Sequence, residues 1–273
     1  MNSLRGKTAA VTGAASGLGR AMALAFAHEG MALALADVDE KGLAETLRLV
    51  SGVKTSSMKV DVSRAEEVDA FCASLKDVHV VCNNAGVSPV GPLWENTTAD
   101  WRWALGVNLW GVIHGVRAFV PRLVAQGEGH VVNTASVAGL ISPPGMGIYN
   151  VTKHAVVALS ESLHHDLRVQ GSPVGVSVLC PAYVPTGISD SERNRPPELA
   201  NPALSERQKA LKQNLRKAVS SGKLTADDVA RAVVAAIKEN RFYILTHPRI
   251  KGAIQARMED ILNERAPRNP LSL

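Results

Sequence analysis

The amino-acid sequence predicts a single α/β domain, in which a doubly wound parallel sheet carries helices on both faces. Short apolar runs alternate with single amphipathic stretches, and strands separated by single helices are typical of βαβ units. The runs are apolar throughout, as expected for parallel strands buried on both sides. The chain has 273 residues, 46% of them hydrophobic and 20% charged, which favours one large folded domain and argues against a disordered chain.

The expected elements follow this alternation in order. Strands are predicted at residues 8–12, 32–36, 57–60, 78–82, 130–134, 174–179 and 242–245. Helices are predicted at residues 17–29, 40–50, 65–75, 99–124 and 138–170. No internal repeat divides the chain, so residues 1–273 are predicted to form one domain.

One polar stretch, residues 187–222, breaks the alternation, and we name it the lid segment. Four prolines lie in its first half or just before it: Pro185, Pro196, Pro197 and Pro202. Long insertions in compact domains are usually functional lids or partly disordered loops, so we expect this stretch to cover a substrate site. A helical tail is predicted at about residues 249–273.

The charge is uneven along the chain. Residues 1–190 carry 14 basic and 16 acidic side chains, net −2, whereas residues 191–273 carry 16 and 9, net +7. The basic residues are interleaved with acidic ones and form no runs. This pattern favours a solvated helical surface over a surface that binds nucleic acid or an anionic membrane.

The cysteines argue against a disulfide framework and against a metal site. Cys72, Cys82 and Cys180 are odd in number and form no CxxC pair. We therefore expect a reducing, cytoplasmic setting. The first strand follows the initial methionine too closely for a signal peptide, and no apolar run approaches the roughly 18–20 residues of a membrane span.

A glycine-rich loop follows the first predicted strand. Its sequence is Thr12-Gly13-Ala14-Ala15-Ser16-Gly17-Leu18-Gly19. Glycines allow a tight turn and a close approach to a ligand, and the start of the next helix offers free N–H groups to a phosphate. We therefore predict a dinucleotide site at Gly13, Ser16, Gly17, Leu18 and Gly19. The G-x-x-x-G-x-G spacing differs from the usual G-x-G-x-x-G, and a turn without a ligand is the alternative.

The end of the second predicted strand favours NAD over NADP. Asp37 lies 18 residues after Gly19, where an acidic residue typically binds the adenosine ribose. A carboxylate would repel a 2′-phosphate, and Ser16 stands where a basic residue would attract one. The alternative is that Asp37 merely caps the next helix, although Asp39 is an equally good cap.

Polar residues also follow the third and fourth predicted strands. These are Asp61-Val62 and Asn83-Asn84-Ala85-Gly86. Open α/β sheets bind ligands at the carboxyl ends of their strands. We therefore expect these residues to bind the adenine or to tie adjacent strands together.

A tyrosine and a lysine share one predicted helix face. Tyr149 and Lys153 are four residues apart, and a nearby ammonium lowers the pKa of a phenol enough for acid–base chemistry near neutrality. Ser136 lies 13 residues before Tyr149, at the end of a predicted strand, where its hydroxyl is placed to hold a substrate oxygen. The alternative is a surface pair, which the glycine loop and Asp37 together disfavour.

In these residues the chain resembles the short-chain dehydrogenase/reductase family, in its single-domain, NAD(P)-dependent branch with a Rossmann-type fold. The resemblance covers nearly the whole chain. It is carried by Thr12, Gly13, Gly17, Gly19, Asp61, Asn83, Asn84, Ala85, Gly86, Asn108, Ser136, Tyr149 and Lys153. It implies hydride transfer between a nicotinamide and the carbon that bears an alcohol or carbonyl.

The resemblance also implies roles. Tyr149 would be the catalytic acid–base, and Lys153 would lower its pKa and bind the nicotinamide ribose. Ser136 would hold the substrate oxygen, and Asn108 would hold a proton-relay water near Lys153.

One motif departs from the family pattern. The strand at 174–179 is followed by Pro181-Ala182, where the family usually has Pro-Gly. Pro181, Val184 and Thr186 still match positions that contact the nicotinamide half of the cofactor. We therefore expect cofactor binding to persist, with a slightly different loop.

The resemblance places an apolar substrate pocket beside the catalytic residues. Its expected walls are Val87, Pro89, Val90, Leu93, Ala138, Leu140, Ile141, Met146 and Tyr183. Such a pocket suits a hydrophobic or aromatic secondary alcohol or its ketone. Arg193 and Arg195 in the lid segment are candidates to meet a substrate carboxylate, although loop arginines are mostly solvated.

The predicted function is thus NAD-dependent interconversion of a secondary alcohol and a ketone. The alternative is a non-catalytic NAD-binding regulator on the same fold, which the presence of tyrosine, lysine and serine together disfavours. The resemblance further implies a homodimer or homotetramer and a small-molecule substrate.

Overall fold

The computed structural model describes residues 1, 3–201 and 204–272. Its centre is a seven-stranded sheet in the order β3-β2-β1-β4-β5-β6-β7, in which every pair of neighbours is parallel. The strands are β1 (Thr8–Thr12), β2 (Ala32–Asp37), β3 (Thr55–Lys59), β4 (Val80–Asn83), β5 (His130–Thr134), β6 (Gly175–Leu179) and β7 (Tyr243–Ile244). The predicted fold class, a doubly wound parallel sheet, is confirmed.

The strand order reverses beside β1. The chain leaves β1 toward β2 and β3, and then returns to the other side of β1 as β4. Ligands of open α/β sheets bind at the carboxyl ends of the strands where the order reverses. The glycine loop after β1 and the asparagines after β4 therefore flank the expected binding crevice.

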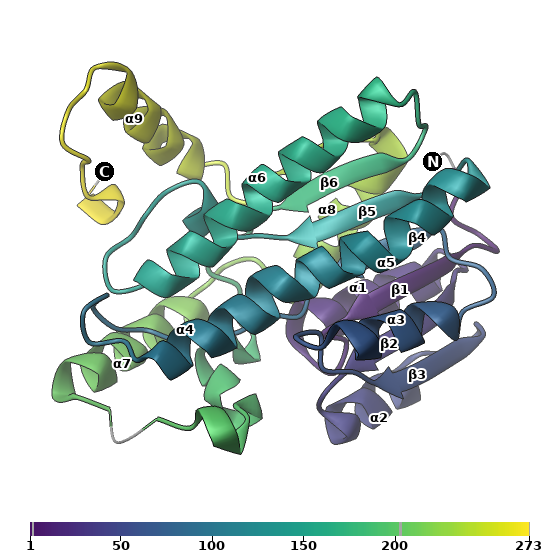
Figure 1. Cartoon of the computed structure of the whole chain (residues 1–273), viewed down its shortest axis with the longest axis horizontal. Coiled ribbons are helices and arrows are strands. Elements are labelled where there is room, and N and C mark those ends of the chain that lie inside the picture. The colour runs from purple at the N-terminus through teal and green to yellow at the C-terminus, as the bar shows by residue number, and fades with distance from the viewer. Residues whose placement is uncertain (2, 202–203, 273) are drawn as a thin grey trace.

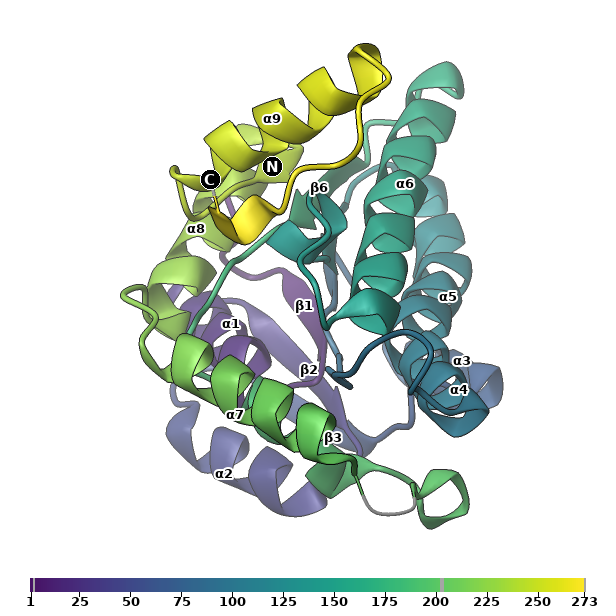
Figure 2. The ribbon, with the colours of Figure 1, turned by 90° about the vertical axis from the view of Figure 1, so that its left-hand side faces the viewer.

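Helices cover both faces of the sheet, as Figure 2 shows. The helices are α1 (Gly17–His28), α2 (Glu40–Leu49), α3 (Ala65–Ala73), α4 (Thr98–Leu105), α5 (Gly111–Gln126), α6 (Gly147–Val169), α7 (Glu206–Ser220), α8 (Ala226–Glu239) and α9 (Ile250–Leu262). One core joins α1, α2 and α8 to one face of the sheet. Another joins α3, α5 and α6 to the opposite face. Successive residues of β1 supply both, since Ala10 belongs to the second core and Val11 to the first.

The predicted helix at 99–124 contains an unexpected irregularity. α4 and α5 are joined without a break by a π-helical turn, Gly106–Trp110. Asn108 lies in this turn and is fully buried. Single π-turns inside α-helices occur frequently at functional sites.

The prediction of a helix from residue 138 is wrong at its start. Only a short 3₁₀ turn, Val137–Gly139, is formed there, and α6 begins at Gly147. Pro143 and Pro144 lack N–H groups and disfavour helical backbone before them, and Gly145 has φ +75°. The catalytic candidates Tyr149 and Lys153 therefore lie in the first two turns of α6.

The lid segment contains more regular structure than its sequence suggests. Its described residues form 3₁₀ turns at Gly187–Asn194 and Pro197–Leu199, followed by α7. The segment is drawn in green at the lower left of Figure 1, and three hydrogen bonds tie it to the N-terminus of α4. Arg195 donates to Asp100 at 2.8 Å, the Thr97 hydroxyl donates to Asn201 at 2.8 Å, and Asn201 donates to Asp100.

The predicted tail begins as a helix, α9, which Arg268 braces by pairing with Asp260. Cys72, Cys82 and Cys180 are buried free thiols. Among the described residues, no helix has the length and hydropathy needed to cross a membrane.

Candidate active site

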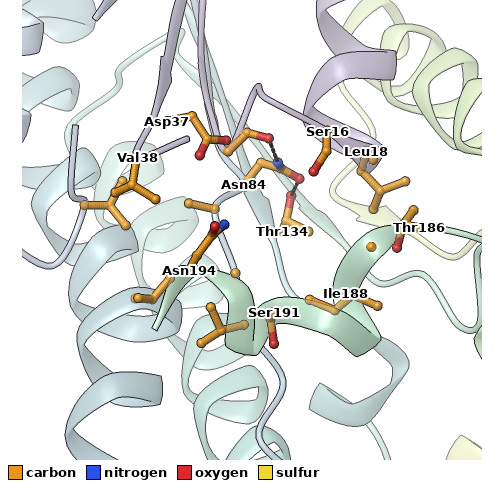
Figure 3. A pocket seen from close by; sticks show the side chains of 18 of the residues that line it. Ser16, Leu18, Asp37, Val38, Asn84, Thr134, Thr186, Ile188, Ser191 and Asn194 are labelled. Atoms are coloured by element: carbon orange, nitrogen blue, oxygen red, sulfur yellow. Dashed lines mark hydrogen bonds between the residues drawn. The ribbon is translucent and has the colours of Figure 1, made fainter. Parts of the chain in front are cut away.

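A cavity of about 240 Å³ lies at the carboxyl edge of the sheet. Figure 3 shows part of its lining, to which residues at or just after the ends of β1, β2, β4 and β5 contribute from one side and the lid segment from the other. The predicted site residues that line it are Gly13, Ser16, Gly17, Leu18, Asp37, Asp61, Val62, Asn84, Ala85, Gly86, Ser136, Tyr149, Lys153, Pro181, Val184 and Thr186. The structure thus brings residues from the whole length of the chain to one cavity.

Two predicted site residues, Gly19 and Asn108, do not line the cavity. A β-carbon at Gly19 would lie 2.0 Å from the carbonyl oxygen of Gly13. Gly19 therefore acts behind the cavity, by allowing α1 to pack against the glycine loop. Asn108 likewise lies behind the cavity wall.

The glycine loop has the form of an anion cradle. Gly13 and Gly17 have φ of +67° and +53°, a backbone region that glycine adopts without strain. A β-carbon at Gly13 would lie 2.8 Å from Cα of Ala85. The hydroxyl of Ser16 does not cap α1, and the first turn of α1 has no acidic residue. The helix therefore presents unpaired N–H groups and the positive end of its dipole.

Asp37 lines the cavity and does not cap the next helix. Its carboxylate accepts hydrogen bonds from the backbone N–H of Ala15 at 2.9 Å and of Asp39 at 3.0 Å. Asp39 caps α2 by accepting from the N–H of Gly42. Capping of α2 by Asp37, the alternative considered from the sequence, is therefore excluded. Burial raises the pKa of Asp37, against backbone hydrogen bonds from Asp39, Ala15 and Val38 that lower it.

Asn84 ties three strands together beneath the cavity. Its side chain donates to the carbonyl of Thr12 at 3.0 Å and accepts from the hydroxyl of Thr134 at 3.3 Å. The Thr12 hydroxyl in turn accepts from the N–H of Asn84. The expectation that an asparagine would link adjacent strands is confirmed for this residue.

Asn108 fixes the loop after β4 against α6. Its Oδ1 accepts from the N–H of Val87 at 2.8 Å, and its Nδ2 donates to the carbonyl of Val87 at 2.9 Å and to the hydroxyl of Thr152 at 3.1 Å. Both hydrogens of Nδ2 are thus used by the protein, whereas Oδ1 accepts one of the two hydrogen bonds that an amide oxygen can take.

Tyr149, Lys153 and Ser136 share the cavity. The Lys153 ammonium donates to the carbonyl of Thr134 at 2.8 Å and lies 5.6 Å from the centroid of the Tyr149 ring. The Ser136 hydroxyl donates to the carbonyl of Pro181 at 3.3 Å.

The pKa values of Tyr149 and Lys153 differ from the prediction. Burial raises the pKa of Tyr149 to about 12, and the opposing contribution comes from a hydrogen bond with Ser136. Burial lowers the pKa of Lys153 to about 8. The expectation that Lys153 brings the Tyr149 pKa toward neutrality is therefore wrong for this arrangement. The ammonium donates to the Thr134 carbonyl, and desolvation of the phenol is the largest cause of the raised pKa.

Ala182 fits its loop without strain. Among the described non-glycine residues, positive φ occurs at Asn240 and Glu264, so Ala182 has an ordinary backbone. Its N–H donates to the His247 ring at 3.2 Å. The departure from the Pro-Gly pattern thus leaves the loop in place.

Most residues of the expected apolar substrate wall lie outside this cavity. Of its nine residues, Val87 lines the cavity and the other eight do not. Ala138 and Ile141 are core residues, while Leu93 and Tyr183 are exposed. The late start of α6 explains part of this difference, because residues 138–146 form turns and not a helix.

The lid segment, which the sequence predicted to cover a substrate site, supplies the opposite wall, but most of its lining residues were not predicted individually. Figure 3 shows Ile188, Ser191 and Asn194 on this side. Arg193, Pro196 and Leu199 also line the cavity. Ser191 accepts a hydrogen bond from the N–H of Ser88 at 3.0 Å, across 103 positions of sequence. No local pattern signals so distant a contact.

Arg195 does not line the cavity, because its buried side chain pairs with Asp100, so the suggestion that it meets a substrate carboxylate is wrong.

Comparisons with known proteins agree with this geometry. The sequence profile of short chain dehydrogenases matches residues 7–197. The crystal structure of a short chain dehydrogenase/reductase from Burkholderia phymatum in complex with NAD is 52% identical, covers 100% of both chains and superposes with a TM-score of 0.98.

Two relatives have named activities. A 1-deoxy-11-beta-hydroxypentalenate dehydrogenase from Streptomyces avermitilis is 35% identical over 96% of this chain and 90% of its own. A C alpha-dehydrogenase from Sphingobium sp. strain SYK-6 is 30% identical over 98% of this chain and 89% of its own. The chain therefore belongs to the short-chain dehydrogenases, a family of oxidoreductases.

Proposed function

We propose that the protein is an NAD-dependent dehydrogenase that interconverts a secondary alcohol and its ketone, on a substrate with a hydrophobic or aromatic group. One observation carries the proposal: Ser136, Tyr149 and Lys153 share a cavity with the glycine loop and Asp37. A regulator that only bound the nucleotide would not need the first three. The NAD complex of the Burkholderia protein and the two dehydrogenase relatives support the same reading.

The residues fit a dinucleotide. The lack of a side chain at Gly13 lets the glycine loop pack closely against Ala85, and α1 offers unpaired N–H groups to a diphosphate. The Asp37 carboxylate is placed to accept from ribose hydroxyls and to repel a 2′-phosphate, which favours NAD. When bound, the nicotinamide supplies the hydride-transfer chemistry; the protein supplies position and proton transfer.

Tyr149 and Ser136 would have different roles at the substrate oxygen. Tyr149 exchanges a proton with this oxygen, and Ser136 donates a hydrogen bond to it. A phenol with a pKa of about 12 is a proton donor at neutral pH, as ketone reduction requires. Alcohol oxidation needs the phenolate, which burial disfavours here; Lys153, one turn further along α6, would bind the nicotinamide ribose.

The surface of the central helices favours association of copies of this chain. Trp110, in the π-turn, is 52% exposed, and Val151, on α6, is 48% exposed. Exposed apolar side chains of this size on long helices fit the homodimer or homotetramer that family resemblance implies.

The test uses NAD and NADP separately, with aliphatic, aryl and steroid secondary alcohols, and follows the absorbance of the reduced cofactor. We expect turnover with NAD, and a fall in kcat of about 10³ in Tyr149→Phe. Tyr243→Phe is the matched control, because that exposed hydroxyl bonds Glu161 far from the cavity. NADH binding without turnover of any alcohol or ketone would favour the regulator, and full activity in Tyr149→Phe would overturn the catalytic assignment.

A further inference from the structure

We propose that Arg193 of the lid segment binds the diphosphate of the cofactor, so that this segment closes on the cofactor as well as on the substrate. The inference rests on the proposed NAD site. Neither the family pattern nor the glycine loop itself points to this residue.

Arg193 bridges the lid segment and the glycine loop. Its Nη1 donates to the carbonyls of Gly187 at 2.9 Å and Asp190 at 3.0 Å, and its Nη2 donates to the Ser16 hydroxyl at 3.4 Å. The side chain lines the cavity. Two backbone carbonyls therefore hold the guanidinium in place, with one edge directed at the loop that precedes α1.

The carboxylates near Arg193 in sequence are paired with other cations. Asp190 pairs with Arg216 of α7, and Glu192 pairs with Arg195 at 3.4 Å. Within the described part of the chain, no carboxylate lies within ion-pair distance of Arg193. Its charge is therefore available to an anion in the cavity.

The start of α1 is where such an anion fits. The Ser16 hydroxyl accepts from Arg193 and does not cap the helix. A β-carbon at Gly17 would lie 3.2 Å from Cβ of Thr186, so the start of the lid segment faces the glycine loop closely. An anion on the N–H groups of α1 thus lies within reach of the guanidinium, whose fork of donors matches phosphate oxygens.

Two other ligands fit less well. A substrate carboxylate must lie close to Tyr149, and Arg193 contacts the glycine loop instead. A 2′-phosphate would have to approach the Asp37 carboxylate, which is fixed nearby on the N–H of Ala15. Of these three anions, the diphosphate is the one expected at the N-terminus of α1.

The experiment measures the Kd of NADH, of ADP-ribose, which keeps the diphosphate, and of adenosine, which lacks it. We expect Arg193→Gln to raise the Kd of NADH and ADP-ribose about 10-fold, the size of a charged hydrogen bond, and to change that of adenosine less than about twofold. The Kd of NADH for Arg193→Lys should lie between those of the unmodified protein and Arg193→Gln. The salt dependence of NADH binding should be weaker in Arg193→Gln than in the unmodified protein. Arg207→Gln is the matched control, because Arg207 pairs with Glu95 on the surface.

Three results would overturn the inference. They are an unchanged Kd for NADH in Arg193→Gln, an equal loss for adenosine and ADP-ribose, and an equal loss in Arg102→Gln, which removes another cavity-lining arginine. The last would assign the effect to the overall charge of the cavity. Failure of the unmodified protein to bind NADH would instead refute the proposed function, and this inference with it.

Discussion

The wall formed by the glycine loop and strand ends differs from the wall formed by the lid segment in what holds it in place. The first is fixed by backbone contacts and buried hydrogen bonds between neighbouring strands, such as those of Asn84. The second is fixed by side-chain pairs that join distant segments, such as Asp100 and Arg195. The first wall should therefore tolerate almost no added volume, and the second should respond mainly to loss of charge.

The largest effect is expected in the first wall. Gly19→Ala places a β-carbon 2.0 Å from a backbone carbonyl, which should cost about 3 kcal/mol or more of stability. Gly252→Ala in α9 is the matched control, since nothing lies within 4 Å of a β-carbon there, and it should stabilise the helix slightly. Urea denaturation measures both. Equal stability of the two variants would show that α1 can move away from the glycine loop.

The next effect is expected in the second wall. Asp100→Asn removes the buried carboxylate that accepts from Arg195 at 2.8 Å and leaves the longer contact with Glu192, which should cost about 2–3 kcal/mol. Glu95→Gln, which breaks the exposed pair with Arg207, should cost less than about 1 kcal/mol. Hydrogen exchange should rise in the lid segment of the Asp100 variant. Similar losses of stability in the two variants would contradict the expectation that the buried ion pair contributes more than the exposed one.

The same pair predicts a pH dependence. Burial alone would raise the pKa of Asp100, but hydrogen bonds from Thr97, Arg195 and Asn201 hold it below its usual value. Its contribution to stability is therefore present above the unfolded pKa of about 4 and is lost as the pH falls further. The stability difference between Asp100→Asn and the unmodified protein should shrink over that range.

A smaller effect concerns cofactor choice. Asp37→Ser should lower the preference for NADH over NADPH about 10-fold, because a like charge no longer repels a 2′-phosphate. Asp39→Asn is the control, since asparagine caps α2 as well as aspartate does. The ratio of the two Kd values is the measurement, and an unchanged ratio in Asp37→Ser would remove this residue from cofactor selection.

The smallest effect is expected at Ala182. Ala182→Gly should cost about 0.5–1 kcal/mol, mainly through the greater freedom of the unfolded chain, and should leave the Kd of NADH within about twofold. A tighter Kd would show that the alanine methyl restricts the nicotinamide loop after all.

The sequence predicted the first wall better than the second, for a physical reason. Gly13, Ser16 and Asp37 are recognisable because their chemistry depends on residues within one βαβ unit. The lid residues Ser191 and Asn194 reach the cavity through contacts such as Ser191 with Ser88, which no local periodicity encodes. The Tyr149 pKa was predicted wrongly for a related reason: the spacing of Tyr149 and Lys153 says nothing about how deeply the surrounding fold desolvates them.

The π-turn between α4 and α5 has a mechanical consequence. Each residue of a helix turns the chain by about 100°, so the wider turn at Gly106–Trp110 offsets the angular register of α4 from that of α5. The α4 end contacts the lid segment through Asp100, while α5 packs on the sheet through Phe119 and Leu123. Removing one residue from this turn would rotate the lid's anchor away from Arg195 while leaving the sheet contacts intact. The length of this single turn thus sets how Asp100 is oriented toward Arg195 relative to the sheet.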